Sequence, residues 1–445
     1  MELNTGIQRV VRQVIRHLEK ASRDGGFQVI PVDISHCQFT AVAQTALYPL
    51  APGPAAEKTS VVFWLKRYLR QVYWASRVLL AAVLCHPAAQ RFCMAPRDQF
   101  GLNWIADHFL VKPARGIAEI FQKSRPSAKA KEIRIAQGDI LLLLDSSWYM
   151  DIWPSVSRAK REGALVYSVT YDIIPITHPQ FCDAFLAAVF KEWFLTSLKY
   201  VDGYIAISNT VKEDLLCFMR RDFGADIASK QFDYFLLGSD FDYQRVLGGS
   251  VREEIVQVFR ARPTYLFVST IEPRKNHAYL LDVFAQLWAE GREVNLCFVG
   301  RVGWKVEKIV DRIIHSPEYN KRLFHWADIN DAELAHCYAN AVMLLFPSIV
   351  EGFGLPIVES LGHGLPVLAS DIPVHREIGG GKIGYFSLDD PRSLATMIRT
   401  IDEQGIPPGL MVEKGYRWQD WETSARMLLE KLMAASSRQA WDRGR

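Results

Sequence analysis

Short apolar runs alternate with amphipathic helical segments along this chain, and this alternation restricts the fold more than any other feature. Buried strands of a parallel sheet have this composition, and the helices between them supply the crossover connections. The pattern therefore predicts an α/β protein with a doubly wound, Rossmann-like sheet in each half. The predicted strands are Gln28–Val32, Asp139–Asp145, Ala164–Thr170, Gly203–Ile207, Phe232–Leu237, Thr264–Ile271, Val294–Gly300, Leu323–Trp326, Val342–Phe346 and Pro366–Ala369.

The length of 445 residues exceeds what one hydrophobic core usually supports, so two domains of about 200 residues each are expected. We predict an N-terminal acceptor-binding domain over residues 1–245 and a C-terminal nucleotide-binding domain over residues 246–415. The polar stretch between residues 238 and 262 contains Gly248-Gly249 and separates them. Residues 416–445 are expected to form a final amphipathic helix and tail that pack back toward the first domain.

Basic residues are concentrated in one part of the chain. The net charge of +3 is too small to indicate nucleic-acid binding. From Val61 to Ile135, however, thirteen Lys or Arg stand against four Asp or Glu. Within this part, Phe63–Cys85 interleaves aromatic and basic residues but lacks the roughly 20 apolar residues that a spanning helix needs. It suits peripheral contact with an anionic membrane, or else it is an ordinary domain helix.

The cysteines do not suggest a metal site. The seven cysteines include no C-x-x-C pair, and their spacing is not that of zinc ligands. They are expected to be small buried residues in a reducing compartment. Because Met1–Thr5 is polar and no signal-peptide pattern follows, we expect a cytoplasmic protein, either free or peripheral on the inner face of the cell membrane.

The segment FPSIVEGFGLPIVES, residues 346–360, carries the strongest functional signal. It places Glu351 on a loop after an apolar strand and Glu359 inside the helix that Pro356 would begin. Gly352 and Gly354 leave the backbone bare at the helix N-terminus, where unpaired N–H groups and the helix dipole favour a phosphate. Two ordinary surface glutamates beside a glycine turn are the alternative, since a lone Gly-x-Gly is a weak signal.

Two cations mark a second strand-to-helix turn. In VSTIEPRKNH, residues 268–277, Arg274 and Lys275 follow Pro273 and precede a helix. Together they can hold a diphosphate through charge-assisted hydrogen bonds. Taken singly, they would be surface cations at a helix start.

These motifs resemble those of retaining glycosyltransferase family 4. The paired glutamates are similar to its E-x7-E motif. EGFGLP and the Arg-Lys-Asn turn are similar to its donor-site sequence motifs. The resemblance implies the GT-B fold, in which two Rossmann-like domains face a cleft. The opening NTGIQRVVRQVIRHLE resembles the family's first glycine loop and helix, but the strand expected before it is missing.

The resemblance also implies roles for individual residues. Glu351 would hold the sugar and, together with Asp172 and His178 of SVTYDIIPITHP, form the catalytic group. Glu359 would bind the ribose. Ser208, which follows the strand in AISNTVKEDL, is expected to cap a helix. The donor nucleotide would contact Arg274, Lys275, Gly300, Phe353, Gly354, Leu355 and Glu359.

The expected activity is that of a hexosyltransferase acting with retention at the anomeric carbon. GDP-mannose is the favoured donor, and a glycan or lipid-linked glycan of polysaccharide or lipopolysaccharide assembly is the expected acceptor. No metal and no other cofactor is expected. A nucleotide-sugar epimerase that shares the phosphate cations but not the spaced glutamates is one alternative. A catalytically silent GT-B-like scaffold is the other, and the missing first strand favours it.

Overall fold

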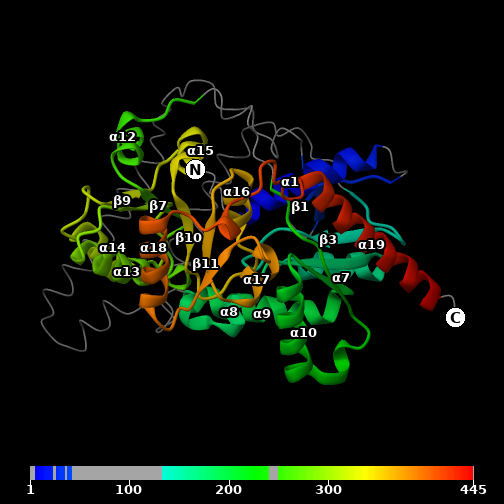
Figure 1. Ribbon diagram of the computed structural model, residues 1–445. Helices are drawn as coiled ribbons and strands as arrows, with labels where there is room; N and C mark the ends of the chain where they lie inside the picture. The colour runs from blue at the N-terminus through cyan, green and yellow to red at the C-terminus, as the bar shows by residue number, and fades with distance from the viewer. Residues whose placement is uncertain (1–5, 24–26, 36–37, 43–132, 240–248, 444–445) are drawn as a thin grey trace, which may run out of the picture. The chain divides into compact units, whose positions relative to one another are not determined.

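The computed structural model describes residues 6–23, 27–35, 38–42, 133–239 and 249–443, and Figure 1 shows their helices and strands. The chain divides into two compact units, of which one is Ala41–Lys131 and the other contains the remaining residues. Almost all of Ala41–Lys131, including the basic aromatic segment Phe63–Cys85, lies outside the described residues. Apart from residues 41 and 42, all described residues belong to the second unit, and the predicted boundaries at residues 245 and 415 stay predictions.

The predicted α/β class is confirmed, with one parallel sheet in each half of the sequence. The first sheet has four strands in the order β3-β4-β5-β6, and three of its intervening helices are long enough to act as crossovers. Its elements are β3 (Ile140–Leu143), α7 (Trp153–Arg161), β4 (Leu165–Thr170), α8 (Ile174–Thr177), α9 (Ala184–Tyr200), β5 (Gly203–Ala206), α10 (Asn209–Phe223) and β6 (Gln231–Tyr234).

The second sheet has six parallel strands in the order β12-β11-β10-β7-β8-β9. The order reverses between β7 and β10, and in an open parallel sheet such a reversal is where ligands bind. Its elements are α12 (Glu253–Ala261), β7 (Thr264–Val268), α13 (His277–Ala289), β8 (Asn295–Val299), α14 (Glu307–Ile314), β9 (Leu323–Trp326), α15 (Asp331–Asn340), β10 (Met343–Phe346), α16 (Leu355–Gly362), β11 (Val367–Ser370), α17 (Pro373–Gly379), β12 (Gly384–Phe386) and α18 (Pro391–Gln404).

One predicted strand is wrong. Gln28–Val32 was expected to join the first parallel sheet, but residues 28–31 have no regular structure. Val32 instead begins β1 (Val32–Ser35), which pairs with β2 (Gln38–Ala41) in a separate two-stranded sheet. The first described element is the helix α1 (Gly6–Ser22), so the described residues contain no strand before the opening helix.

The first and last helices pack together. Helix α19 (Trp421–Arg443) contacts α1 and strand β6, and Figure 1 shows α19 in red beside α1 in blue. Trp421, Ala425, Leu428 and Leu432 are buried at helical spacing, as the sequence pattern predicts. Ser424 Oγ donates to the Leu236 carbonyl oxygen over 2.7 Å. The end of the chain is therefore anchored on the first sheet.

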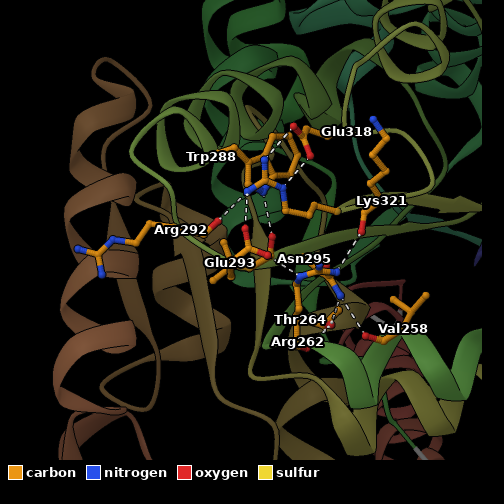
Figure 2. Close-up of polar contacts among 11 residues, drawn as sticks. Val258, Arg262, Thr264, Trp288, Arg292, Glu293, Asn295, Glu318 and Lys321 are labelled. Atoms are coloured by element: carbon orange, nitrogen blue, oxygen red, sulfur yellow. Dashed lines mark hydrogen bonds and ion pairs between the residues drawn. The ribbon is translucent and has the colours of Figure 1, made fainter.

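A polar network ties together the amino ends of β7, β8 and β9 (Figure 2). Arg322 donates to Glu318 from two nitrogens, at 2.7 and 2.8 Å, and its guanidinium lies 5.8 Å from the Trp288 ring centroid. Asn295 Nδ2 donates to the Val258 carbonyl oxygen over 3.0 Å and to Thr264 Oγ1 over 3.2 Å. The network lies at the amino end of the strands, so the opposite end is left to the functional side chains.

Two further sequence expectations can be compared with the structure. Of the described cysteines, Cys182, Cys297 and Cys337 are buried as expected, but Cys217 is exposed on α10. No helix within the described ranges is long and apolar enough to cross a membrane.

Candidate functional site

The candidate site lies where β7 and β10 end, because the two strands are parallel neighbours and their carboxyl ends meet at one edge. The chain leaving β7 forms the short 3-10 turn Pro273–Lys275, which carries both predicted cations. The chain leaving β10 carries Glu351. A backbone hydrogen bond of 2.8 Å from Ile349 N to the Arg274 carbonyl oxygen fixes the two loops together.

Glu351 is paired with both cations. Arg274 Nη1 lies 2.6 Å from Glu351 Oε2, and Lys275 Nζ donates to Oε1. Arg274 Nε also lies 3.2 Å from Glu272 Oε2. All four side chains are largely shielded from solvent, with Glu351 9% exposed and Glu272 7% exposed. The sequence prediction that these residues meet at one place is therefore consistent with the geometry, although their roles stay predictions.

The electrostatics of this cluster favour an ionised Glu351. Burial by itself would raise the pKa of the Glu351 carboxyl, but Arg274 and then Lys275 outweigh burial and lower that pKa to about 2. Burial and the neighbouring Arg274 lower the pKa of Lys275. Burial raises the pKa of Glu272. The cluster thus holds two cations against one firmly ionised carboxylate, and Glu272 gives up its charge more readily than an exposed glutamate does.

Asp172 approaches the same cluster from the first sheet. It follows β4, and its Oδ1 accepts a 3.0 Å hydrogen bond from the backbone of Ile174. Burial raises the pKa of Asp172, opposed by Arg274. A Cβ added at Gly352 would lie 2.2 Å from the Tyr171 carbonyl oxygen, so the Tyr171–Asp172 turn is in close contact with the glycine loop that follows Glu351. This contact places Asp172 beside the predicted donor residues.

His178 has different neighbours. Its Nδ1 lies 2.9 Å from Thr177 Oγ1, and its ring stacks on Phe181 with centroids 6.1 Å apart. The described contacts do not join it to Glu351, Arg274 or Lys275. Its predicted catalytic role is untested.

The N-terminus of α16 completes the donor side. Gly354 precedes the helix with φ of 96°, a left-handed conformation that favours glycine. Leu355 is the first helical residue and Pro356 follows it, as the sequence predicts. The side chain of Phe353 is buried against Trp418, with ring centroids 6.1 Å apart, so it faces the core rather than the bare amides. Phe353 can contact a ligand there only through its backbone.

Glu359 lies farther along α16, in the second turn of the helix, and has partners of its own. Arg9 Nη1, from α1, is 2.5 Å from Glu359 Oε1. The Tyr338 hydroxyl, from α15, donates to Oε2 over 3.1 Å. Glu359 is 5% exposed. Neither partner was predicted, although Arg9 stands in the NTGIQRVVR opening that the sequence had singled out.

The glycine loop after β8 crosses the same edge of the sheet. Gly300 has φ of 146°, and a Cβ there would lie 2.1 Å from the Ser269 carbonyl oxygen. Trp304 Nε1 donates to the Phe181 carbonyl oxygen over 3.0 Å, and Lys305 Nζ donates to that of Cys182. The predicted nucleotide loop therefore also contacts the segment after α8.

The sequence did not predict, or predicted only in part, two other contacts near the carboxyl ends of the strands. Ser208 caps α10 as predicted, accepting from Val211 N over 3.2 Å, and its hydroxyl also donates to the Gly352 carbonyl oxygen over 2.8 Å. The carboxylate of Glu377, from α17, accepts from the backbone N–H groups of Asn209 and Thr210, both over 2.7 Å. The sequence does not indicate this role of Glu377, because a contact 168 residues away leaves no local signal.

Metal binding has no support in the described part of the chain, where no group of three or more His, Cys, Asp or Glu side chains is arranged to hold an ion. The expectation of a metal-independent reaction stays a prediction.

The part of the chain that carries this site matches a known protein family. Residues 252–406, which contain the second sheet and the Arg274–Glu351 cluster, match the family model described as glycosyl transferases group 1. Among solved structures, the alpha,alpha-trehalose 6-phosphate synthase from Burkholderia multivorans aligns with a TM-score of 0.50 at 10% identity, over 69% of this chain and 73% of that one. The likeness supports the predicted two-sheet GT-B fold.

Curated relatives are mannosyltransferases. The serotype-specific mannosyltransferase WbdA of Escherichia coli is 30% identical over 309 residues, which are 67% of this chain and 38% of WbdA. The O-antigen chain mannosyltransferase RfbU of Salmonella typhimurium is 26% identical over 52% of this chain and 60% of RfbU. The chain thus spans well under half the length of WbdA. Residues 252–406 thus belong to the glycosyl transferases group 1 family, and the chain is similar to GT-B mannosyltransferases.

Proposed function

We propose that this protein is a retaining hexosyltransferase that moves a sugar from a nucleotide-diphosphate donor to a glycan or lipid-linked glycan acceptor. The observation that carries the proposal is the meeting of Arg274, Lys275 and Glu351 beside the N-terminus of α16. GDP-mannose is the favoured donor. The names of the relatives, which are mannosyltransferases and in part O-antigen chain enzymes, support a role in lipopolysaccharide assembly.

The donor side supplies charge where the leaving group needs it. Breaking the bond between sugar and phosphate leaves negative charge on the departing diphosphate and positive charge on the sugar ring. Arg274 and Lys275 stabilise the diphosphate, together with the amides at the start of α16. Because both cations already lie in a largely shielded site, their interaction with phosphate is stronger than it would be in water.

Glu351 stays ionised between the two cations and faces the place where the attached sugar would lie. It orients the sugar hydroxyls and contributes negative charge near the developing positive ring. Asp172, on the loop from the first sheet, accepts a hydrogen bond from another sugar hydroxyl. The phosphate oxygen itself accepts the proton of the acceptor hydroxyl, so no side chain has to act as a strong base. On this account the reaction needs no metal and no cofactor beyond the donor substrate.

The proposed acceptor and location in the cell depend on one segment of the sequence. The basic aromatic segment Phe63–Cys85 favours a lipid-linked acceptor at an anionic membrane surface, but it lies outside the described residues. Contact with that surface stays a prediction.

A donor screen tests the proposed function. The purified protein is incubated with GDP-mannose and with a panel of UDP-sugars, with and without lipid-linked glycan acceptor, and free nucleoside diphosphate is measured. We expect GDP release that increases when acceptor is added. Interconversion of the sugar without nucleotide release would show an epimerase, and the absence of both turnover and nucleotide binding would show a scaffold.

A further inference from the structure

The ion pair between Arg9 and Glu359 joins the start of the chain to a helix more than three hundred residues later. Arg9 belongs to α1, which lies outside residues 252–406, the part that matches the family model. The Arg9 side chain remains 38% exposed, whereas the Glu359 side chain is 6% exposed. A partly exposed arginine is therefore paired with a shielded carboxylate.

The Glu359 carboxylate is held at both oxygens. Arg9 takes Oε1, and the Tyr338 hydroxyl takes Oε2. The Tyr338 ring is itself fixed by stacking on His363, with centroids 5.1 Å apart and ring planes within 10° of parallel. A carboxylate held in this way has a defined plane and a defined rotation about its last bond.

Counting acceptor positions shows what the carboxylate can still bind. Each carboxylate oxygen has two lone pairs, and one direction on each oxygen is used by Arg9 or Tyr338. Counting only the contacts of described residues, one direction on each oxygen remains for another donor. Two hydroxyls on adjacent carbons, as in a ribose, present two donors at a spacing that matches the two oxygens of one carboxylate. A single free hydroxyl or an anionic group would not use this arrangement.

We propose that Arg9 is a positioning residue for the ribose of the donor nucleotide, acting through Glu359. This inference rests on the proposed function and on the ribose-binding role of Glu359 that the family resemblance implies. Arg9 holds the carboxylate in one orientation, so that both remaining acceptor directions face the two ribose hydroxyls. The first helix thus contributes to donor binding without touching the nucleotide.

Two simpler roles for Arg9 predict different effects of its loss. If Arg9 turned toward the diphosphate when the nucleotide bound, its loss would weaken all diphosphates, with or without ribose hydroxyls. If Arg9 served only to hold α1 in place, its loss would lower stability without changing which nucleotide is preferred. Only a residue that acts through Glu359 on the ribose makes the effect of its loss depend on the hydroxyls.

The test measures dissociation constants for GDP and for 2′,3′-dideoxy-GDP by calorimetry on the full chain. We expect the wild type to bind GDP about tenfold more tightly, in line with two hydrogen bonds to a charged acceptor. In Arg9→Ala, GDP binding should weaken by about fivefold and dideoxy-GDP binding by less than twofold. Arg9→Lys should restore part of the difference. The matched control is Arg16→Ala, which removes an exposed arginine from the same helix and should change neither constant.

Tyr338→Phe provides a second variant in case Arg9→Ala does not fold. It removes only the hydroxyl and should reduce the preference for GDP in the same direction. Equal weakening of both nucleotides in Arg9→Ala, or no weakening of either, overturns the inference. Equal binding of both by the wild type also overturns it but leaves the diphosphate site intact. If the wild type binds neither GDP nor UDP, the proposed function itself fails.

Discussion

Glu351 is paired with both Arg274 and Lys275, the two cations that we expect to bind the diphosphate. We expect Glu351→Gln to lower nucleotide release at least about 100-fold, because an amide cannot offset the charge that develops on the sugar ring. GDP affinity should be retained or increased, since the variant frees both cations. The measurements are steady-state GDP release and calorimetric GDP binding. Glu413→Gln, at an exposed glutamate, is the control, and undiminished release in Glu351→Gln would remove Glu351 from the reaction.

The same substitution has a predictable effect on stability. The pKa of Glu351 falls on folding from 4.5 to about 2, so its ionised form stabilises the native state. That contribution is present above pH 4.5 and is lost as the pH falls toward 2. Urea unfolding of Glu351→Gln should therefore show a stability loss at pH 7 that shrinks in acid. A loss that does not change with pH would contradict the paired, ionised state.

His277 provides an independent test of buried electrostatics. Its ring lies between Phe267 and Phe298, with centroids 4.5 and 4.9 Å away, and neither ring nitrogen has a hydrogen-bond partner among the described residues. Burial lowers its pKa from 6.5 to about 3. The unfolded chain therefore takes up a proton below pH 6.5 that the native state refuses, and stability falls between pH 6.5 and 3.

We expect His277→Leu to remove this acid sensitivity. One histidine with this shift costs about 2 kcal/mol at pH 5 relative to pH 8. The variant should also gain stability at pH 8, because an apolar side chain leaves no unpaired polar group in the core. The measurement is the free energy of unfolding at both pH values. Equal losses in the wild type and the variant between pH 8 and pH 5 would show that the imidazole is hydrated or paired.

At the scale of single residues, some site residues could be predicted from the sequence and others could not. Arg274, Lys275 and Gly354 stand in short contiguous motifs, so their local conformation and mutual proximity followed from strand ends and glycine turns. The partners of Glu359 did not follow, because Arg9 and Tyr338 meet it only through tertiary packing between helices distant in sequence. A charge pair of this kind has no signal in a single sequence.

At the scale of secondary-structure elements, the glycine loop before α16 depends on close backbone approach. In Gly352→Ala, the added Cβ would lie 2.2 Å from the Tyr171 carbonyl oxygen, so the turn that carries Asp172 must move. We expect nucleotide release to fall at least about tenfold, since displacement of about 1 Å at a catalytic group can cost 100-fold. Gly362→Ala, at the last residue of α16 and with nothing within 4 Å of the added Cβ, should be harmless. Equal activity in both variants would contradict the close contact.

The network at the amino ends of β7 to β9 (Figure 2) predicts a purely structural effect. Asn295 is 1% exposed and donates to Val258 and Thr264. Asn295→Ala should lower the free energy of unfolding by about 1–3 kcal/mol, because two buried acceptors lose their donor. GDP affinity should stay within twofold of the wild type. A selective loss of GDP binding without a loss of stability would place the functional edge at the wrong end of the sheet.

Most strands could be predicted from the sequence because they are buried and apolar. Strands without a continuous apolar run could not be predicted in this way. Continuous apolar runs located β4, β8 and β10 to within a residue or so, because strands buried on both faces need such runs. Gln28–Val32 has β-branched residues but joins no parallel sheet, since its short apolar stretch also suits a partly exposed connection. Strand β12, Gly384–Phe386, was missed because an edge strand of three residues is too short to show a pattern.

At the scale of the whole molecule, side chains of each described half form hydrogen bonds with the backbone of the other half. Glu377 accepts from the first residues of α10, Ser208 donates to Gly352, and Lys305 donates to Cys182. These contacts bring residues of both sheets to the Arg274–Glu351 cluster. The family match covers only the second sheet, whereas the account requires that residues of the first sheet and of α1 also take part.

The most direct test of the central claim is a crystal structure of the protein with GDP-mannose or a non-hydrolysable analogue. The account predicts that the diphosphate contacts Arg274 and Lys275 and lies at the N-terminus of α16, with the sugar beside Glu351 and the ribose hydroxyls on Glu359. A nucleotide bound elsewhere, or a bound nucleotide whose phosphates leave Arg274 and Lys275 paired only with Glu351, would contradict it.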